Sequence, residues 1–573
     1  MPWLWIAVST TSTEKPNCPK KCGNITIPYP FGLGNPRCSL SKSFLLKCNH
    51  SMSPNSSSKL LLGDLQVLNI SVEEGTVTVS TYEIWVLRET CHTRTGYLPA
   101  YRTSYGLHIR AIHCDWLRTC DTLGYIRDSD ASRFGSGCIS ICYHPVNLTR
   151  KGPCSGVGCC QTQIPNGVKT FNMSISALYI NYEYSRNFSP CSYIFLARKD
   201  WFDFSSRDLV SLTNVHRKPP TVLDWVVGEE ICESMDLSAS SSSIYPCEPH
   251  TNCVNSNNDP RCCCVCKPGY QGNPYLSEGC FEKLLPMPWL WIAASATSTE
   301  KPNCPKKCGD ITIPYPFGIG NPRCSMNKSF LLKCNHSKSS NSSSKLLLGD
   351  LQVLNISVEE GTVTVSTYVP YYCYNMSRIG LDYWSYQVNL TGTPFTFSAT
   401  ENRVIAIGCD TLGCITDIDG TQFVSGCASI CDHPVNLTRE GPCSGIGCCQ
   451  TQIPNGLKSI DMSIDAVYNY TYSRHFSPCN YVFLARKDWF DFSSIDLISL
   501  TNVDRKPPTV LDWAVGEETC KSMDLSYASS SIYPCGPNTN CADSNNGPGY
   551  RCVCKPGYQG NPYLSESQGC KGT

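Results

Sequence analysis

The sequence predicts a mostly β protein made of small, disulfide-rich modules in two tandem copies. Three observations carry this prediction: 40 cysteines in 573 residues, strand-like alternation of apolar and polar residues with poor helical periodicity, and a long internal repeat. Alternation of this kind indicates strands with one buried face. A cysteine density of roughly one in 14 indicates cores too small to be stable without disulfides.

The repeat is a duplication of the whole unit. The stretch that begins at Met287 matches the stretch that begins at Met1, and Lys59–Tyr82 is identical to Lys345–Tyr368. We call residues 1–286 copy one and residues 287–573 copy two. The period far exceeds the roughly 20–50 residues of a solenoid repeat, so each copy is expected to hold several domains. Met287 and the apolar run after it indicate the start of the duplicated unit, now a linker at 282–300.

The cysteines also predict the compartment. Thiols at this density stay reduced in the cytosol and form disulfides outside the cell, so we expect a secreted, extracellular protein. Zinc binding is the alternative, but the Cys-x3-Cys pairs at Cys18/Cys22 and Cys138/Cys142 belong to no regular Cys-x2-Cys array, and no histidine pair has ligand spacing. We therefore predict no metal and no other cofactor.

Glycosylation sequons agree with secretion. Fifteen Asn-x-Ser/Thr tripeptides occur, more than chance readily explains, and a glycan requires a solvated surface. The expected sites include Asn24, Asn69, Asn147, Asn355, Asn389 and Asn436.

The N-terminus resembles a truncated signal peptide. The apolar run Trp3–Val8 is shorter than a normal signal core and no basic residue precedes it, so residues 1–14 are interpreted as a remnant. The alternative is that Trp3 and Trp5 pack on the first domain. No run approaches the roughly 18–20 apolar residues that cross a bilayer, so no membrane span is predicted.

Positive charge gathers at the start of each copy. Met1–Lys59 holds seven basic residues against one acidic residue, and Met287–Lys345 holds eight against two, although the net charge of the chain is zero. A polyanionic partner is one interpretation, and a solvated, solubilising face is the other. No nucleic-acid partner is predicted.

Strand signals are strongest in the first part of each copy. Leu68, Ile70 and Val72 alternate with polar residues, a turn follows, and Val77 and Val79 alternate again, which predicts a β-hairpin with one apolar face. The prolines of Ile25–Gly32 favour an extended edge or a turn. In copy two, Thr393–Asp410 predicts two more β-rich runs around a polar turn.

The last part of each copy resembles an EGF-like domain. In copy two it holds six cysteines with a Cys-x-Cys pair followed by Gly-Tyr, and copy one has two more, Cys262 and Cys263. Six cysteines alone allow fifteen connectivities. The segments "VGEEIC" and "VGEETC" lack the acidic pattern of calcium-binding members. The resemblance implies the pairs Cys520–Cys541, Cys535–Cys552 and Cys554–Cys570 in copy two, and Cys232–Cys253, Cys247–Cys264 and Cys266–Cys280 in copy one.

With "CPKKCGNITIPYPFGLG", "SGCASIC", "GPCSGIGCCQTQIP" and the EGF-like part, each copy resembles the extracellular region of plant wall-associated receptor kinases. The resemblance implies a galacturonan-binding module, and so binding of pectic polysaccharide in the plant cell wall. No kinase motif follows in the sequence, which predicts a kinase-less, receptor-like ectodomain. Between Glu83 and Thr119 copy one loses the alternation of copy two, so that segment is expected to be disrupted.

The resemblance also divides the chain. The expected galacturonan-binding-like modules are 15–124, disrupted over 83–119, and 301–413; the Cys-rich ectodomain regions are 125–228 and 414–516; the EGF-like domains are 229–281 and 517–571.

Counting cysteines leaves some without an expected partner. Copy one has 21 and copy two has 19, while the motifs use twelve plus six in each. The remainder are candidates for unpaired thiols, mispairing or a bridge between copies, and they are Cys114, Cys262, Cys263 and Cys414.

Galacturonan carries a carboxylate on each sugar, which lysine meets as a point charge and arginine meets bidentately. Tyr315 and Phe317 are candidates to stack on sugar faces, and core packing is the alternative for both. The basic candidates are Lys306, Lys307, Arg323, Lys328 and Lys333 in copy two, and Lys20, Lys21, Arg37 and Lys47 in copy one.

The sequence argues against an enzyme. It holds no Gly-x-Ser-x-Gly, no His-Glu-x-x-His and no phosphate loop, so no catalytic residue is proposed. Two alternatives to carbohydrate binding stay open. One is a protein-interaction module that meets receptor ectodomains through its EGF-like domains, and the other is a non-functional fragment of a receptor kinase gene.

Overall fold

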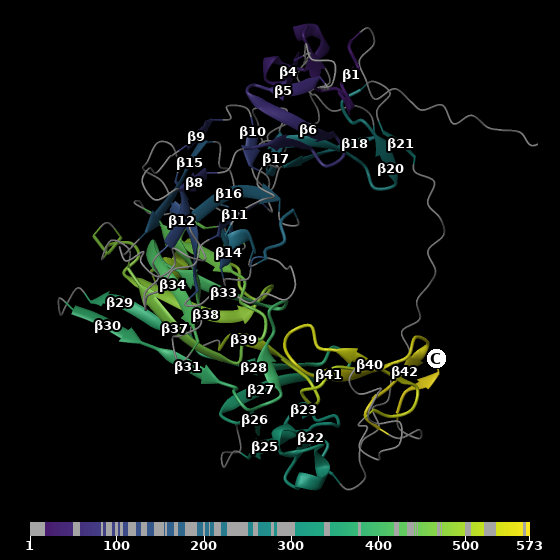
Figure 1. The fold of residues 1–573 in the computed structure, drawn as a ribbon, viewed down its shortest axis with the longest axis vertical. Helices are drawn as coiled ribbons and strands as arrows, with labels where there is room; N and C mark the ends of the chain where they lie inside the picture. Colours follow the sequence, from purple (N-terminus) through teal and green to yellow (C-terminus); the bar gives the residue numbers. More distant parts are fainter. Residues whose placement is uncertain are drawn as a thin grey trace, which may run out of the picture.

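The computed structural model confirms a mostly β protein with disulfide-rich modules in two similar halves (Figure 1). Figure 1 shows one module sheet of each copy at opposite ends of the molecule, with two large sheets between them. In copy one the structure describes residues 18–49, 58–81, 84–86, 94–97, 101–103, 107–112, 122–127, 135–142, 154, 158–164, 170–177, 192–198, 201–205, 207–210, 219–225, 250–255, 262–276 and 280–282. In copy two it describes residues 304–336, 344–375, 380–417, 423–431, 441, 443, 445–466, 470–471, 473–498, 506–520, 535–564 and 569–572.

A seven-stranded sheet forms the first module of each copy. In copy one its order is β10 (Tyr101–Thr103), β17 (Pro220–Trp225), β7 (Thr76–Ser80), β6 (Leu65–Ser71), β5 (Lys59–Leu62), β4 (Leu45–Asn49) and β3 (Gly32–Leu33). In copy two it is β24 (Gly318–Ile319), β25 (Leu331–Asn335), β26 (Lys345–Leu348), β27 (Leu351–Ser357), β28 (Thr362–Ser366), β39 (Pro508–Trp513) and β32 (Phe395–Phe397). Strands β17 and β39 come from far along the chain, so each of these sheets includes a strand that follows the large-sheet strands in sequence.

A short ribbon precedes each of these sheets, and two 3₁₀ turns lie in the chain between the first two strands of the sheet. They are the ribbons β1 (Lys21–Cys22) with β2 (Ile25–Thr26) and β22 (Lys307–Cys308) with β23 (Ile311–Thr312), and the 3₁₀ turns η1 (Pro36–Cys38), η2 (Lys42–Phe44), η5 (Pro322–Cys324) and η6 (Lys328–Phe330).

The predicted hairpin is present as β6 and β7, but its inward face differs from the prediction. Val77 and Val79 are fully buried as expected. On β6, however, Val67 is buried while Leu68 is 40% exposed. A register shift between Val67 and Asn69 explains the difference, because a bulge changes the side to which the following side chains point.

Two large sheets lie face to face and draw strands from both copies. The nine-stranded sheet has the order β30 (Gly380–Trp384), β29 (Tyr371–Asn375), β38 (Cys479–Arg486), β33 (Asn402–Ile407), β36 (Cys448–Thr451), β14 (Cys159–Gln163), β11 (Leu107–Ile112), β16 (Ser192–Arg198) and β8 (Ile84–Val86). The eight-stranded sheet has the order β31 (Tyr386–Asn389), β37 (Ser459–Asp465), β34 (Asp410–Thr416), β35 (Phe423–Ile430), β13 (Gly135–Cys142), β12 (Thr122–Arg127), β15 (Thr170–Ala177) and β9 (Arg94–Tyr97). The runs predicted over Thr393–Asp410 are β32 and β33.

Two short helical turns follow strands of the nine-stranded sheet: α1 (Arg207–Val210) follows β16, and η7 (Ser494–Leu497) follows β38.

The EGF-like parts form short two-stranded ribbons. These are β18 (Thr251–Asn255) with β19 (Cys262–Cys266), β20 (Tyr270–Gly272) with β21 (Cys280–Glu282), β40 (Thr539–Asp543) with β41 (Tyr550–Cys554), and β42 (Tyr558–Gln559) with β43 (Lys571–Gly572). In copy two, the buried side chains of Tyr550, Cys552 and Tyr563 belong to the same hydrophobic cluster as Phe317 and Trp513. The EGF-like part therefore shares one core with the first module.

The structure contains the copy-two EGF-like disulfides Cys520–Cys541, Cys535–Cys552 and Cys554–Cys570, which are the pairs that the resemblance implies. Cys266–Cys280 is present in copy one. Cys232 and Cys247 lie outside the described residues, Cys253 lies in β18 with its side chain undescribed, and Cys264 is disulfide-bonded.

Of the outcomes expected for Cys414, the unpaired thiol is wrong, because its sulfur is disulfide-bonded and the residue is 1% exposed, and the bridge between copies is the alternative that fits. Each copy taken alone has an odd number of cysteines, 21 and 19, which suggested a leftover thiol in each. The two copies together have an even number, so a bond between copies can pair the leftover cysteines. The other eighteen cysteines of copy two bond to one another, so the partner of Cys414 belongs to copy one. Cys114 and the side chains of Cys262 and Cys263 lie outside the described part of the chain.

Candidate functional site

The basic candidates of copy two sit on short, well-anchored segments of the first module. Lys307 lies in β22 and Lys333 in β25, and both are exposed. Arg323 lies in η5, where the side-chain oxygen of Asn321 accepts a hydrogen bond from the Arg323 backbone N–H at 3.0 Å. Lys328 begins η6, which Asn327 caps in the same way. Lys306 is also exposed. The caps fix the backbone of these turns, so the charged side chains start from defined positions.

Two disulfides hold these segments together. Cys308–Cys334 has a Cα–Cα distance of 5.8 Å, and its cysteines are the sequence neighbours of Lys307 and Lys333. Because consecutive Cα atoms are 3.8 Å apart, the Cα atoms of these two lysines lie at most about 13 Å apart. Cys304–Cys324 likewise ties the start of the module to the turn that carries Arg323. The basic segments thus form one covalently braced surface, which we call the basic surface.

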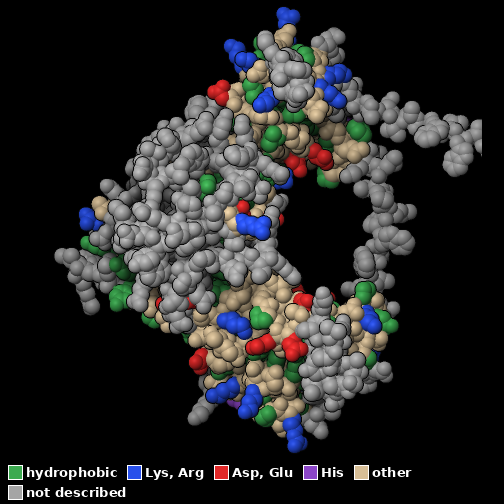
Figure 2. Space-filling view, in the orientation of Figure 1, with side chains coloured by type: hydrophobic (Ala, Val, Ile, Leu, Met, Phe, Trp, Pro, Cys, Tyr) green, Lys and Arg blue, Asp and Glu red, His purple; other side chains and the backbone are tan. Residues whose placement is uncertain are grey.

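Copy one repeats this arrangement. Lys20, Lys21, Arg37 and Lys47 are exposed on the equivalent segments, braced by Cys18–Cys38 and Cys22–Cys48. Figure 2 shows lysine and arginine side chains gathered at both ends of the molecule, over the two first modules.

Phe317 is not available to a sugar, which corrects the stacking prediction for this residue. It is 2% exposed, and its ring centroid lies 5.2 Å from that of Phe330 and 5.5 Å from that of Trp513, in edge-to-face geometry. The sequence shows that Phe317 is aromatic but not that β39 returns to cover it with Trp513. Its equivalent Phe31 contacts Phe44 and Trp225 in the same way.

Tyr315 is half-buried and packs against the edge of that core. Its backbone oxygen accepts a hydrogen bond from the side-chain amide of Asn561 at 2.5 Å. This tyrosine joins the first module to the EGF-like part, and stacking on a sugar stays a prediction for its ring.

Sequence reasoning missed a partly exposed aromatic cluster in copy two, which we call the aromatic platform: Tyr368, Trp384 and the half-buried Tyr386. The rings of Trp384 and Tyr386 are stacked at 5.9 Å with an interplanar angle of 24°, and Tyr368 meets both edge-on. Tyr368 is 43% and Trp384 41% exposed. The density of aromatics between Tyr368 and Tyr386 was the signal that could have found it.

A lysine completes this platform. The Nζ atom of Lys506 lies 4.4 Å from the centroid of the Tyr368 ring and donates a hydrogen bond to its hydroxyl at 3.0 Å. Burial, then the neighbouring Tyr368 and the Asp350 carboxylate, raise the pKa of Tyr386 to about 12. The phenol of Tyr386 is therefore uncharged at neutral pH, and the platform offers apolar ring faces beside one cation.

Of the expected glycosylation sites, Asn24, Asn69, Asn355 and Asn389 are exposed, and Asn147 and Asn436 lie outside the described residues. Asn24 and Asn69 line a cavity of about 400 Å³ between the first module of copy one and Asn273 of its EGF-like part. The described residues contain no group of three His, Cys, Asp or Glu side chains that could hold a metal ion. They also contain no helix long and apolar enough to cross a membrane.

Comparison with known proteins shows which kind of domain carries the basic surface. Residues 18–81 and 304–367 match the galacturonan-binding domain of wall-associated receptor kinases, and these ranges contain the basic surface of each copy. The chain is 35% identical over 271 residues to wall-associated receptor kinase 2 of Arabidopsis thaliana, and 35% identical over 274 residues to wall-associated receptor kinase 1. Each alignment covers 47% of this chain and 34% of the relative. A solved oxalate decarboxylase chain matches with 10% identity over 80% of this chain and 82% of its own length. Its TM-score of 0.11 is too low to indicate a common fold.

The chain is thus a tandem of two regions similar to the extracellular part of wall-associated receptor kinases, each with a galacturonan-binding domain. It spans about a third of the length of the curated relatives it matches.

Proposed function

We propose that this protein binds pectic polysaccharide, a homogalacturonan or its oligomers, in the plant cell wall, and does so without catalysing a reaction. The observation that carries the proposal is the basic surface. In both copies the residues that match the galacturonan-binding domain hold exposed lysines and an arginine on segments joined by two disulfides. An anionic polymer with a carboxylate on every sugar is the partner that suits such a surface.

The binding is expected to be electrostatic and distributed. One exposed charge pair contributes only about 0–1 kcal/mol, so several cations must meet several carboxylates along the polymer. The affinity therefore falls as salt rises, because exposed charges are screened within roughly 10 Å at 0.1 M salt.

The aromatic platform supports a second contact in copy two. Tyr368 follows β28, which belongs to the same sheet as β25 with its Lys333. Three strand spacings separate β25 from β28, a distance of about 14 Å. A polymer lying across the sheet would meet the cations first and the aromatic faces of Trp384 and Tyr386 beyond them.

The two modules lie at opposite ends of the molecule (Figure 1). Two sites on one chain raise the apparent affinity for a polymer long enough to reach both, and give no such gain on a short oligomer. We therefore infer that long galacturonan chains bind more tightly than short ones.

We infer further that the protein acts outside the cell, as its disulfide content supports. Fourteen bonds among the described residues would not persist in a reducing compartment.

The test is binding of de-esterified oligogalacturonides to the full chain, secreted from a eukaryotic host, at two salt concentrations. The variant Lys20/Lys21/Lys306/Lys307→Ala should bind more weakly and show a smaller salt dependence. A matched control is Lys267/Lys487/Lys555/Lys571→Ala, which removes the same charge from exposed positions outside the two matched domains. Equal loss in both variants would show a non-specific effect of net charge, and absence of binding by the folded protein would refute the proposal.

A further inference from the structure

The two copies meet along the edges of both large sheets, and the contact is reciprocal. In the eight-stranded sheet, β13 of copy one pairs antiparallel with β35 of copy two, with Cys138 opposite Cys427. These two cysteines hold the same place in the repeated motif Ser-Gly-Cys-x-Ser-Ile-Cys. On either side of this centre, Ser136 faces Ser429 and Ser140 faces Ser425. Ser136 is equivalent to Ser425, and Ser140 is equivalent to Ser429. Exchanging the two copies therefore turns one of these pairs into the other, as a two-fold axis would.

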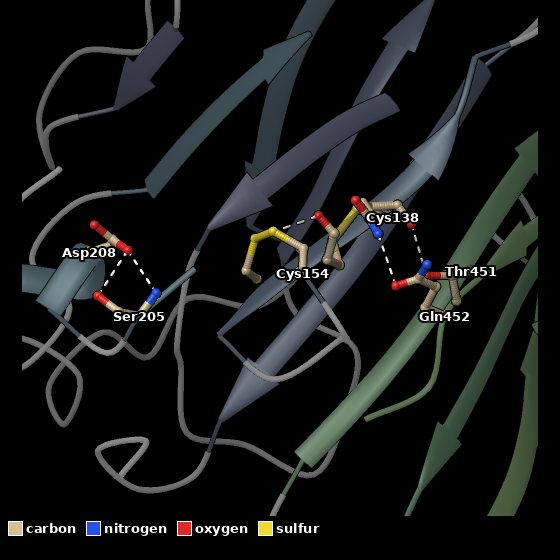
Figure 3. Close-up of a disulfide and its surroundings, with 9 residues drawn as sticks. Cys138, Cys154, Ser205, Asp208, Thr451 and Gln452 are labelled. Carbon is tan, nitrogen blue, oxygen red and sulfur yellow. Dashed lines mark hydrogen bonds between the residues drawn. A yellow bond between two sulfur atoms is a disulfide. The ribbon is translucent and has the colours of Figure 1, made fainter. Parts of the chain in front are cut away.

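The nine-stranded sheet repeats the relationship. Thr162 of β14 lies opposite its equivalent Thr451 of β36. The Thr162 hydroxyl donates to the Gln450 backbone oxygen at 3.1 Å, and the Thr451 hydroxyl donates to that of Gln161 at 2.9 Å. Figure 3 shows Thr451 and Gln452 reaching across to copy one beside Cys138.

The glutamine side chains add a second reciprocal pair. The amide of Gln161 donates to the side-chain oxygen of Gln452 at 3.0 Å, and the amide of Gln450 donates to that of Gln163 at 3.1 Å. Gln161 and Gln450 are equivalent residues, as are Gln163 and Gln452. An interface in which residue i meets j and j meets i is isologous, the kind that holds two-fold symmetric dimers together.

Each copy presents its edge on a braced scaffold. Cys138–Cys160 joins β13 to β14, and Cys427–Cys449 joins β35 to β36, so both edge strands of a copy move as one body. Without its neighbour, a copy would leave the backbone groups of two edge strands unpaired, which is a template for pairing with another chain.

We propose that this interface is a two-fold dimer interface brought into one chain by the duplication, and that each copy, when separate, binds a second copy of the same unit through these two strand edges. The partner is thus a repeat unit of this protein. In the intact chain the duplication satisfies both edges internally.

Copy two has a core of its own and all but one of its cysteines bonded within the copy, so we expect it to fold by itself. Two core clusters among its described residues consist of copy-two residues alone. All its cysteines except Cys414 are bonded within the copy. Cys414→Ser removes the one sulfur that joins the copies, so any remaining association is non-covalent.

The first experiment uses the full chain. A protease site is placed in the linker of a Cys414→Ser chain, the chain is cut, and the molar mass is measured by light scattering after gel filtration. The two halves are expected to elute together at the mass of the uncut chain. Elution as two separate halves would overturn the proposal.

The second experiment uses residues 299–573 with Cys414→Ser in analytical ultracentrifugation. A concentration-dependent species of twice the monomer mass is expected. Thr451→Lys would bury an unpaired ammonium in the dimer and should give a folded monomer, whereas Thr451→Ser keeps the hydroxyl and should still dimerise. Near-ultraviolet circular dichroism checks that each variant is folded. A folded Cys414→Ser unit that stays monomeric, or a dimer that survives the additional Thr451→Lys, would contradict this interface.

Discussion

The side-chain amide of Asn561 donates a hydrogen bond to the backbone oxygen of Tyr315, and in copy one Asn273 does the same to Tyr29 at 2.6 Å. Each asparagine also accepts from the backbone N–H two residues on, in Tyr563 and Tyr275. One side chain therefore orients the EGF-like part and fixes it to the segment that carries the candidate sugar-stacking tyrosine. The relationship is the same in both copies, and this contact between the EGF-like part and the first module was not predicted from the sequence.

We expect Asn561→Ala to lower the free energy of unfolding of the copy-two module by about 1–3 kcal/mol, because the Tyr315 oxygen loses its donor in a partly buried place. The measurement is urea unfolding followed by tryptophan fluorescence. The control is Asn540→Ala, on an exposed position of β40, which should leave the midpoint unchanged. Equal midpoints for both variants would contradict this role.

Trp513 is the centre of the core shared by the first module and the EGF-like part. It is 2% exposed and meets Phe317, Phe330 and Tyr563 with ring centroids 5.5–5.6 Å apart. Trp513→Ala should lower the unfolding free energy by about 3–5 kcal/mol. Trp513→Phe should cost clearly less, because the indole Nε1 of Trp513 has no hydrogen-bond partner among the described residues. Thermal unfolding of both variants distinguishes the two outcomes.

Lys333→Glu tests the basic surface by reversing one charge at its centre. Affinity for an oligogalacturonide should fall by up to about thirtyfold, since one favourable pair is lost and one repulsion is gained, each of about 0–1 kcal/mol. The decrease should shrink as salt is raised. Isothermal titration at low and high salt measures it, and a loss that is independent of salt would argue against a charge contact.

Trp384→Ala tests the aromatic platform. An aromatic contact contributes about 0.5–1.5 kcal/mol beyond its buried area, so affinity should fall several-fold and equally at low and high salt. Tyr558→Ala removes a ring of similar exposure, 37%, from the EGF-like part and should leave affinity unchanged. If both variants bind like the wild type, the platform has another role.

Asp512 predicts a pH dependence of stability. Burial raises the pKa of this carboxyl above its ordinary value of 3.8, although a hydrogen bond from the Asn546 amide at 2.7 Å acts in the opposite direction. The native state then holds this proton more tightly than the unfolded chain, so stability falls as pH rises from about 3.8 through the native pKa. Asp512→Asn should remove this part of the slope in urea midpoints measured across that range. An unchanged slope would assign the pH dependence to other groups.

The sequence identified the repeat, the β class and the basic segments because these follow from local composition, periodicity and self-similarity. It did not pair Cys308 with Cys334, so only the structure, which joins these cysteines in one bond, brings Lys307 and Lys333 close together. It left stacking on a sugar and core packing both open for Phe317, because the local pattern around this residue is the same whether β39 covers it or not, and the structure shows that it is buried. Leu68 was misplaced for a local reason, since a bulge leaves no mark in an alternating run.

By itself, then, the sequence determined that two equivalent, disulfide-braced units exist and that each opens with exposed positive charge. Those properties depend on residue type and spacing. Only the tertiary structure decided that the EGF-like part shares a core with the first module, that Tyr368, Trp384 and Tyr386 gather beside Lys506, and that β13 meets β35 about a two-fold centre. These contacts join residues far apart in the chain, and their free energy comes from burial and hydrogen bonds that exist only once the strands have met.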